Sequence, residues 1–337
     1  MGSTSDLTMT NPEIFTEIWR GDLLESFHCG HAVVCDEKGE IVHAWGDPTA
    51  LIYPRSSSKM MQALPMIEGG FGDHLTSEQL ALCCASHNGG RIHVDRVRAW
   101  LADMGLSDDD LRCGAHMPYD PETSAELICG HTSPDQCHNN CSGKHAGFLT
   151  FTKALNAGPE YLEIDHPVQL AIRQAHDELT EETSPVFGID GCSAPNFAAS
   201  LHGFARAMAT FASARDKSGA RHAAMDRLIR AMTAHPELVA GEGRSCTELM
   251  RAMDGRVAIK TGAEAVFFAM IPEKKLGVAL KIVDGTTRAS ECAIAAILVK
   301  LGVLDPAHDV TRRYLDAPLT NRRGFEVGTI RAGVALR

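Results

Sequence analysis

The sequence predicts an α+β protein, with an antiparallel sheet flanked by helices and a helical lobe inserted into the sheet lobe. Two observations on the 337-residue chain support this prediction. Runs rich in β-forming residues lie near both ends of the chain, and its middle shows apolar residues at helical spacing. We therefore expect the N-terminal hairpin and the C-terminal strands to form one sheet, which the first and last helices cover.

The N-terminal part of this sheet lobe is predicted from one hairpin and one helix. Residues 31–35 and 41–45 have strand character, and the sequence Asp36-Glu37-Lys38-Gly39 between them suits a bend. Three serines then precede a run of helix formers at residues 59–64 and offer N-caps. Residues 1–10 are small and polar, so we expect a flexible tail there.

The middle of the chain predicts mainly helices. These cover residues 77–85, 94–104, 145–154, 167–180, 197–211 and 220–234. Between them, residues 113–140 are rich in Pro, Asp, His and Gly and show little periodicity. We expect this segment to be irregular and to serve a functional or lid-like role.

Strand character returns near the C-terminus, at residues 256–260, 264–271 and 276–283, before a closing helix at 289–301. The predicted catalytic unit, residues 11–337, thus has a sheet lobe (about 11–75 plus 255–337) and a helical lobe (about 76–254). This layout brings Ser56, at the start of the first helix, near Lys260 at a strand edge. Ser86 would close the cleft from the other side.

Composition and charge narrow the classes of partner. The formal net charge is −11, from 32 basic and 43 acidic residues, and no basic run is present. This argues against nucleic acid and anionic membrane as partners. No apolar run approaches the roughly 20 residues of a membrane span, and no export signal is visible. Because eleven cysteines without such a signal suit a reducing compartment, we expect a cytoplasmic protein.

The first candidate catalytic motif is S-x-x-K, formed by Ser56 and Lys59. On a helix the two residues share one face. A lysine amine that is shielded from water near a helix N-terminus loses proton affinity, so it can serve as the base that a serine nucleophile needs. A capping serine followed by a surface lysine produces the same pattern, so the motif needs support from elsewhere in the chain.

Two later motifs give that support. Ser86-His87-Asn88 has the form S-x-N and Lys260-Thr261-Gly262 is K-T-G, and each pattern occurs once. With S-x-x-K they make the Ser-Lys set of the serine β-lactamases and penicillin-binding proteins. The set predicts a serine amide hydrolase in which Asn88, Thr261 and Gly262 contact the substrate. The spacing departs from that of the lactam-directed enzymes, since Ser86 follows Lys59 closely and Lys260 comes late.

A second group of residues indicates a metal site. Cys141 stands at the start of a predicted helix, where a thiol becomes most acidic, and Cys192 follows some fifty residues later. Two thiolates suit zinc, with His145 or Lys144 as a third ligand. Spacing alone favours His145, because a lysine amine must first lose a proton. Three other interpretations stay open: the two cysteines are merely buried together, Cys137 and Cys141 form a helical pair, or Cys141 is a nucleophile with His145 as base.

The motifs together resemble the rhizobial-type (class 3) L-asparaginases, a family with the serine β-lactamase-like fold. Five motifs occur in the family's order across most of the chain: Arg55–Lys59 (R-S-x-x-K), Ala85–His87 (A-S-H), Cys141–His145 (C-S-G-K-H), Gly188–Cys192 (G-x-D-G-C) and Lys260–Gly262 (K-T-G). The lactam-directed families lack the third and fourth of these.

The resemblance implies two Ser-Lys tandems, one zinc ion per chain and a homodimer. The tandems are Ser56 with Lys59 and Ser86 with Lys260. The implied zinc ligands are Cys141, Lys144 and Cys192, with a water in the fourth position. The resemblance thus implies Lys144 as the third protein ligand, in place of the His145 that spacing favours. The residues implied to support the site are Arg55, His145 and Asp190.

The expected reaction is hydrolysis of L-asparagine to L-aspartate and ammonia. Ser56 attacks the side-chain amide while Lys59 takes its proton, and backbone N–H groups at the helix start hold the oxyanion. The Ser86–Lys260 pair protonates the departing ammonia. Arg55 suits the α-carboxylate of the substrate, and zinc positions the substrate rather than attacking it. The alternatives are another serine amidase, such as a glutaminase or a β-lactam or peptide hydrolase, and a non-catalytic amino-acid-binding protein.

Overall fold

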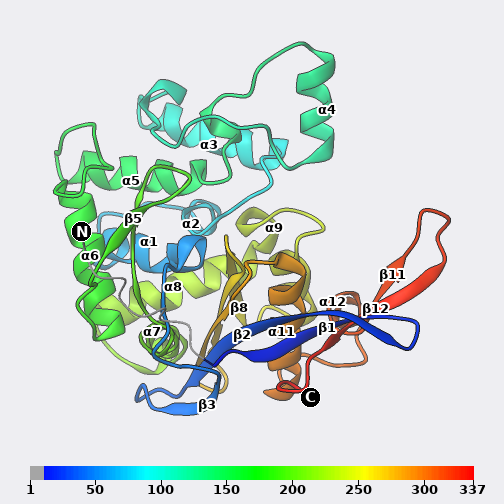
Figure 1. The fold of residues 1–337 in the computed structure, drawn as a ribbon. Helices are drawn as coiled ribbons and strands as arrows, with labels where there is room; N and C mark the ends of the chain where they lie inside the picture. Colours follow the sequence, from blue (N-terminus) through cyan, green and yellow to red (C-terminus); the bar gives the residue numbers. More distant parts are fainter. Residues whose placement is uncertain (1–10) are drawn as a thin grey trace, which may run out of the picture.

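The computed structural model describes residues 11–337, so the predicted tail at residues 1–10 lies outside the described residues. An eight-stranded antiparallel sheet forms the base of the molecule, with the order β11-β12-β1-β2-β10-β9-β8 and with β3 paired to β2 (Figure 1). Its strands are β1 (Glu13–Arg20), β2 (Leu23–Cys35), β3 (Ile41–Trp45), β8 (Ala258–Gly262), β9 (Val266–Ile271), β10 (Leu276–Ile282), β11 (Ala317–Thr320) and β12 (Glu326–Ala332). The α+β prediction, with both ends of the chain in one sheet, is confirmed.

Helices form most of the remaining structure. The helices are α1 (Lys59–Glu68), α2 (Ser77–Cys83), α3 (Arg91–Asp103), α4 (Pro121–Cys129), α5 (Ser142–Ala154), α6 (Pro167–Thr180), α7 (Leu201–Ala212), α8 (Ala220–Ala234), α9 (Pro236–Val239), α10 (Ser245–Ala252), α11 (Thr287–Lys300) and α12 (Asp309–Tyr314). Four short 3₁₀ turns in the described residues are η1 (Arg55–Ser58), η2 (Asp108–Asp110), η3 (Gln136–His138) and η4 (Ala214–Asp216). Two small two-stranded sheets pair β4 (Leu51–Ile52) with β7 (Ala199–Ser200) and β5 (Phe187–Ile189) with β6 (Pro195–Phe197). None of the helices in residues 11–337 is long and apolar enough to cross a bilayer.

Helices α7 and α11 pack against several strands of the large sheet. Helix α11 contacts β1, β10 and β12, as predicted for the last long helix, and α7 contacts β2 and β10. Gly277 of β10 permits the close approach of α7, because a Cβ there would lie 2.0 Å from the Ala209 nitrogen and 2.2 Å from the Ala205 oxygen. The small residues of α7 and this glycine therefore bring helix and strand backbones almost into contact.

The first helix does not cover the sheet, which corrects the predicted layout. Helix α1 packs mainly against α6 and α8 in the helical layer, and only the turn before it, η1, contacts β8 and β9 (Figure 1). The serines also do not cap α1 with their side chains. The Ser57 hydroxyl donates instead to the Val266 carbonyl at 3.2 Å, and that of Ser58 to the Arg55 carbonyl at 3.2 Å. The first bond ties the turn to β9, and the second lies within the turn itself.

The segment 113–140 is less irregular than predicted, because it contains α4 and η3. Asp120 accepts the Thr123 N–H at 2.9 Å as the N-cap of α4, and Pro121 occupies its first position. This Asp-Pro start is a recognised helix signal that the loop-like composition around it obscured. Helix α7 likewise begins at Leu201 rather than at residue 197, because Pro195–Phe197 pairs as β6 with β5.

Candidate active site

A pocket of about 380 Å³ lies where the predicted Ser-Lys motifs meet. Four lining residues come from those motifs: Ser56, Ser86, Thr261 and Gly262. Sequence reasoning missed the other five: Tyr119, Asn140, Arg244, Ala263 and Thr287. Ala263 directly follows K-T-G and Asn140 directly precedes the C-S-G-K-H motif, so adjacency could have identified both. The remaining three belong to no motif.

The turn η1 presents Ser56 to this pocket. Arg55 has a φ of +52°, in the left-handed region that a non-glycine residue seldom adopts, and it directly precedes the half-buried Ser56. Gly262 at the end of β8 lies against the same turn, since a Cβ there would be 2.7 Å from Ser57 Oγ and 2.8 Å from the Pro54 oxygen. A strained turn and a glycine together bring Ser56 to the β8 edge.

Lys59 lies behind the pocket and is 1% exposed. Its Nζ donates to Ser86 Oγ at 2.9 Å, to Cys141 Sγ at 3.1 Å, and to the Ala85 carbonyl. The Ser56 hydroxyl forms no hydrogen bond within residues 11–337, so the predicted contact between Ser56 and Lys59 is not formed here. The S-x-x-K lysine instead contacts the serine of the second motif.

Lys260 approaches Ser86 from the sheet. Its Nζ donates to Ser86 Oγ at 2.9 Å and to the Thr261 carbonyl at 2.7 Å. Burial lowers the pKa of Lys260 to about 7, and the charges of Lys59 and Arg244 act in the same direction. Its neutral form is therefore accessible near neutral pH, which is the condition for a lysine general base.

The loop that carries Ser86 is held on both sides. The Ser86 N–H donates to the Val239 carbonyl at 2.9 Å, and the His87 N–H donates to the Asn140 carbonyl at 3.1 Å. Asn88 does not line the pocket: its side-chain oxygen accepts the Gly90 N–H at 3.2 Å and its amide nitrogen is 3.4 Å from Asp120 Oδ2. The contacts of Asn88 therefore order the loop.

The predicted zinc residues lie together next to Lys59. Lys144 Nζ, near the start of α5, donates to Cys192 Sγ at 3.0 Å, and all three candidate ligands are less than 5% exposed. A hydrogen bond from Cys141 holds the pKa of the Cys192 thiol well below its usual value, and Lys144 adds to this shift. The pKa of Cys141 itself is raised by the same pairing and by burial. For Lys144 burial lowers the pKa, but Cys192 and Cys141 outweigh it and leave the pKa raised.

This donor set suits zinc. Two cysteine sulfurs and one amine meet in a buried position, and zinc binds soft thiolates together with nitrogen. A metal ion would replace the protons that the thiol of Cys141 and the ammonium of Lys144 otherwise share with Cys192. The residues thus fit the implied metal, at the cost of deprotonating Lys144.

His145 is not placed to act as a base for Cys141. Its Nδ1 is hydrogen-bonded to the Tyr161 hydroxyl at 2.9 Å, and its Nε2 has no hydrogen-bond partner among residues 11–337. Burial lowers the pKa of His145 to about 4, so the ring is neutral. The hydrogen bond that a Cys141–His145 nucleophile would require is not formed. Cys137 and Cys141 are also not a helical pair, because Cys137 lies in η3 and α5 begins only after Cys141.

Arg55 and Asp190 form an ion pair. The Arg55 guanidinium contacts Asp190 Oδ1 at 2.8 Å, with side-chain exposures of 25% and 14%. Neither residue lines the pocket. The contact ties the turn before Ser56 to the loop that carries Cys192.

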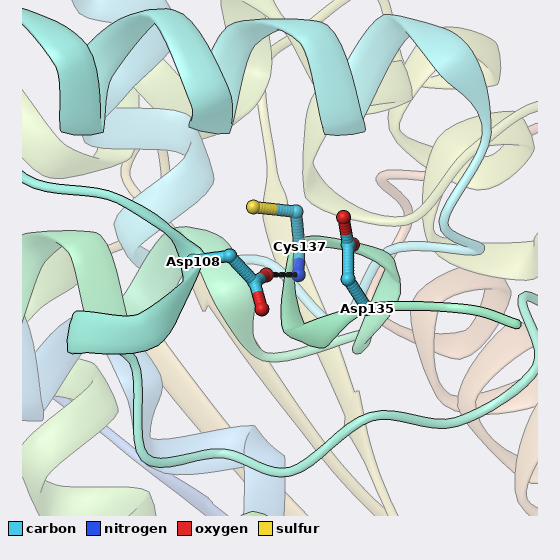
Figure 2. A group of neighbouring side chains, drawn as sticks. All are labelled: Asp108, Asp135 and Cys137. Atoms are coloured by element: carbon cyan, nitrogen blue, oxygen red, sulfur yellow. Dashed lines mark hydrogen bonds between the residues drawn. The ribbon is translucent and has the colours of Figure 1, made fainter.

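Another group of potential ligands lies apart from these residues, at Asp108, Asp135 and Cys137 (Figure 2). Asp108 Oδ1 accepts the backbone N–H of Cys137 at 2.8 Å, and Asp135 is paired with Arg98 and His138 at 2.6 Å each. Burial raises the pKa of the Cys137 thiol, which keeps it protonated. Because one carboxylate is already neutralised and the thiol is protonated, this cluster is a structural network.

The family model described as L-asparaginase II matches residues 16–332. A search of curated proteins finds no match. Similar solved structures include a protein titled Mglu, which is 13% identical, with a TM-score of 0.44 over 90% of this chain and 71% of that chain. A β-lactamase from Mycobacterium bovis is 13% identical, with a TM-score of 0.44 over 80% of this chain and 94% of that chain. An octameric penicillin-binding protein homologue from Pyrococcus abyssi is 13% identical, with a TM-score of 0.39 over 88% of this chain and 80% of that chain.

Proposed function

The chain belongs to the L-asparaginase II family and is an enzyme of the asparaginase type, and from this premise we propose that it hydrolyses L-asparagine through a serine ester. The observation that carries the mechanism is the convergence of two buried lysine amines on one hydroxyl. Lys59 and Lys260 both donate to Ser86 Oγ at 2.9 Å, beside the pocket that Ser56 and Ser86 share.

Ser56 is the better nucleophile of the two serines. The Ser86 oxygen accepts two hydrogen bonds, which occupy both of its lone pairs. The Ser56 hydroxyl is half-buried at the pocket and accepts none within residues 11–337. A free lone pair is what attack on a carbonyl carbon requires. Ser86 then serves best as the link between two bases.

The proposed reaction begins when Ser56 Oγ attacks the side-chain amide carbon of L-asparagine. The serine proton passes by way of Ser86 to Lys260, whose neutral form is accessible near pH 7, while Lys59 holds Ser86 in place through its hydrogen bond. Backbone N–H groups at the start of the helix, including that of Ser56, hold the oxyanion. As the C–N bond breaks, a proton from the Lys59–Ser86–Lys260 unit leaves with ammonia. Water then attacks the β-aspartyl ester and gives up a proton to the same unit, which returns a proton to Ser56 Oγ as the ester C–O bond breaks and L-aspartate leaves.

We also propose that Cys141, Lys144 and Cys192 bind one zinc ion. Bound zinc would supply a positive charge that orients polar groups of the substrate. The contact between Lys59 and Cys141 connects these ligands to the proton-transfer unit. The homodimer and the cytoplasmic location stay predictions from the resemblance and the composition.

Measuring ammonia release from L-asparagine tests this function. L-Glutamine and the chromogenic lactam nitrocefin serve as alternative substrates in separate assays. We expect rapid release from L-asparagine and little turnover of nitrocefin. Faster hydrolysis of L-glutamine or nitrocefin would make the chain a different serine amidase on this scaffold. Binding of L-asparagine without ammonia release would identify a non-catalytic binding protein.

A further inference from the structure

Arg244 is a pocket residue to which no sequence motif assigns a role. It is half-buried, lines the pocket with Ser56 and Ser86, and directly precedes α10. Its guanidinium forms no hydrogen bond or ion pair within residues 11–337; burial raises the pKa of the half-buried Glu291 carboxyl of α11, and the Arg244 charge partly offsets that shift. A guanidinium offers paired donors that match a carboxylate, so a vacant one beside a catalytic pocket is suited to binding one.

The charge of the pocket lining points to the same ligand. Arg244 is the one permanently charged side chain among the nine lining residues, and no carboxylate is among them. The 14-residue helix α11 begins at Thr287, which also lines the pocket, and its N-cap, Thr286, makes no side-chain capping hydrogen bond. The first N–H groups of α11 and the guanidinium thus place two sources of positive potential on one side of the pocket.

The other cations near the site are already engaged. Arg55 is paired with Asp190 and does not line the pocket. Lys59 and Lys260 donate to Ser86. Arg244 is therefore the side chain best suited to bind the α-carboxylate of a free amino acid.

Arg244 is held in a fixed relation to the reacting serines. The segment before it contacts the Ser86 loop through the hydrogen bond from the Ser86 N–H to the Val239 carbonyl. Gly241 lies against Asn88, since a Cβ at Gly241 would be 2.4 Å from the Asn88 amide carbon. The Arg244 N–H then donates to the Gly241 carbonyl at 3.3 Å. These contacts set the distance between a bound carboxylate and the serines.

We propose that Arg244, with the start of α11 at Thr287, binds the α-carboxylate of the substrate. This assignment replaces the one expected for Arg55. It rests on the proposed function, and it makes the enzyme selective for free amino acids with an unblocked α-carboxylate. An amide that lacks this group would bind without the help of Arg244.

Kinetics on two substrates test the assignment. The substrates are L-asparagine and 3-aminopropanamide, which has the same amide without the α-carboxylate. For Arg244→Gln we expect the KM for L-asparagine to rise about ten- to a hundredfold, as the loss of a charged hydrogen bond implies, with kcat within a few-fold of wild type. The KM for 3-aminopropanamide should not change. Arg244→Lys should give a smaller rise in KM, because it keeps the charge but not the paired donors.

Binding measured by calorimetry separates this assignment from the proposed reaction. Wild type should bind L-aspartate more tightly than 3-aminopropanoate, and Arg244→Gln should remove that difference even if no ammonia release were found. Arg91→Gln, at a surface arginine paired with Glu126, is the matched control and should change neither preference. Equal losses on both ligands in Arg244→Gln, or an unchanged preference for L-aspartate, would overturn the assignment.

Discussion

At the scale of single residues, the serine–lysine contacts in the structure differ from those that the sequence spacing predicts. The motifs predicted which residues meet, and the pocket brings Ser56, Ser86, Thr261 and Gly262 together. They did not predict that Lys59 would donate to Ser86. Helical spacing determines where a lysine Cα lies, whereas a side chain with four rotatable bonds turns to whichever buried acceptor is in reach. That choice depends on the loop at residue 86, which sequence periodicity does not describe.

The lowered pKa of Lys260 predicts a pH dependence of activity. Because burial lowers this pKa to about 7, the amine is protonated below that pH and cannot accept a proton. We expect kcat/KM to fall about tenfold per pH unit below about pH 7 and to level off above it. A pH–rate profile for L-asparagine measures this. The control is Lys275→Met, which replaces a surface lysine paired with Asp216 and should leave the profile unchanged. A profile that stays flat well below pH 7 would exclude neutral Lys260 as the base.

Replacing a zinc ligand should affect binding more than chemistry. If zinc positions the substrate, Cys141→Ser should raise KM more than it lowers kcat and should reduce the zinc content from about one ion per chain. Kinetics and metal analysis of the same preparations check this. The exposed Cys129 provides the control, since Cys129→Ser should keep both values. Collapse of kcat at constant KM would instead mean that the metal takes part in the chemical step.

At the scale of elements, the active site depends on a contact between a strand and a turn. The K-T-G motif predicted a glycine near the site, and the structure gives its physical reason. Gly262 lets the end of β8 lie against η1, where Ser56 begins the helical segment. The predicted helices at residues 167–180 and 220–234 match α6 and α8, because their apolar periodicity is long and regular. Short elements such as α10 and β5 were missed, since a few residues carry too little pattern.

Gly262→Ala should disrupt this contact. The new Cβ would lie 2.7 Å from Ser57 Oγ and 2.8 Å from the Pro54 oxygen, so the turn that carries Ser56 must move. We expect kcat/KM to fall about a hundredfold, as misplacement of a reacting group by about 1 Å implies. Steady-state kinetics measure the effect. Gly191→Ala, where a Cβ would meet nothing within 4 Å, should behave like wild type. Equal activity of the two variants would mean that the approach of β8 does not position Ser56.

At the scale of the whole molecule, strands from both ends of the described chain meet in one sheet (Figure 1). The pocket is lined by residues of β8 and of the turn η1 that precedes α1, so the site lies where the sheet meets the helical layer. The strand patterns near residues 31–45 and 256–283 predicted β2, β3, β8, β9 and β10. They did not predict β1, β11 and β12, because mixed polar and apolar sequences such as Glu13–Arg20 give a weak strand pattern. The prediction was correct for the last long helix, α11, but wrong for the other covering helix, which is α7 rather than α1. The position of α7 depends on its long-range fit to Gly277, which no local pattern encodes.

Gly277→Ala should therefore destabilise the entire fold. Its Cβ would meet the backbone of α7 at 2.0 Å, where no side chain can move aside. We expect the free energy of unfolding to fall by about 3 kcal/mol or more, at the upper end of overpacking effects. Urea denaturation measures this, and Gly158→Ala, in open space, serves as the control. A loss within about 0.5 kcal/mol would show that α7 can shift freely on the sheet.

The most direct test of the mechanism is to locate the covalent intermediate. Reaction of L-asparagine with the wild-type enzyme would be quenched in acid during the first turnovers and mapped by peptide mass spectrometry. We predict a β-aspartyl group on the peptide that carries Ser56, and none in Ser56→Ala. The same group on Ser86 or Cys141 would contradict the assignment of Ser56 as nucleophile, and its persistence in Ser56→Ala would do so independently.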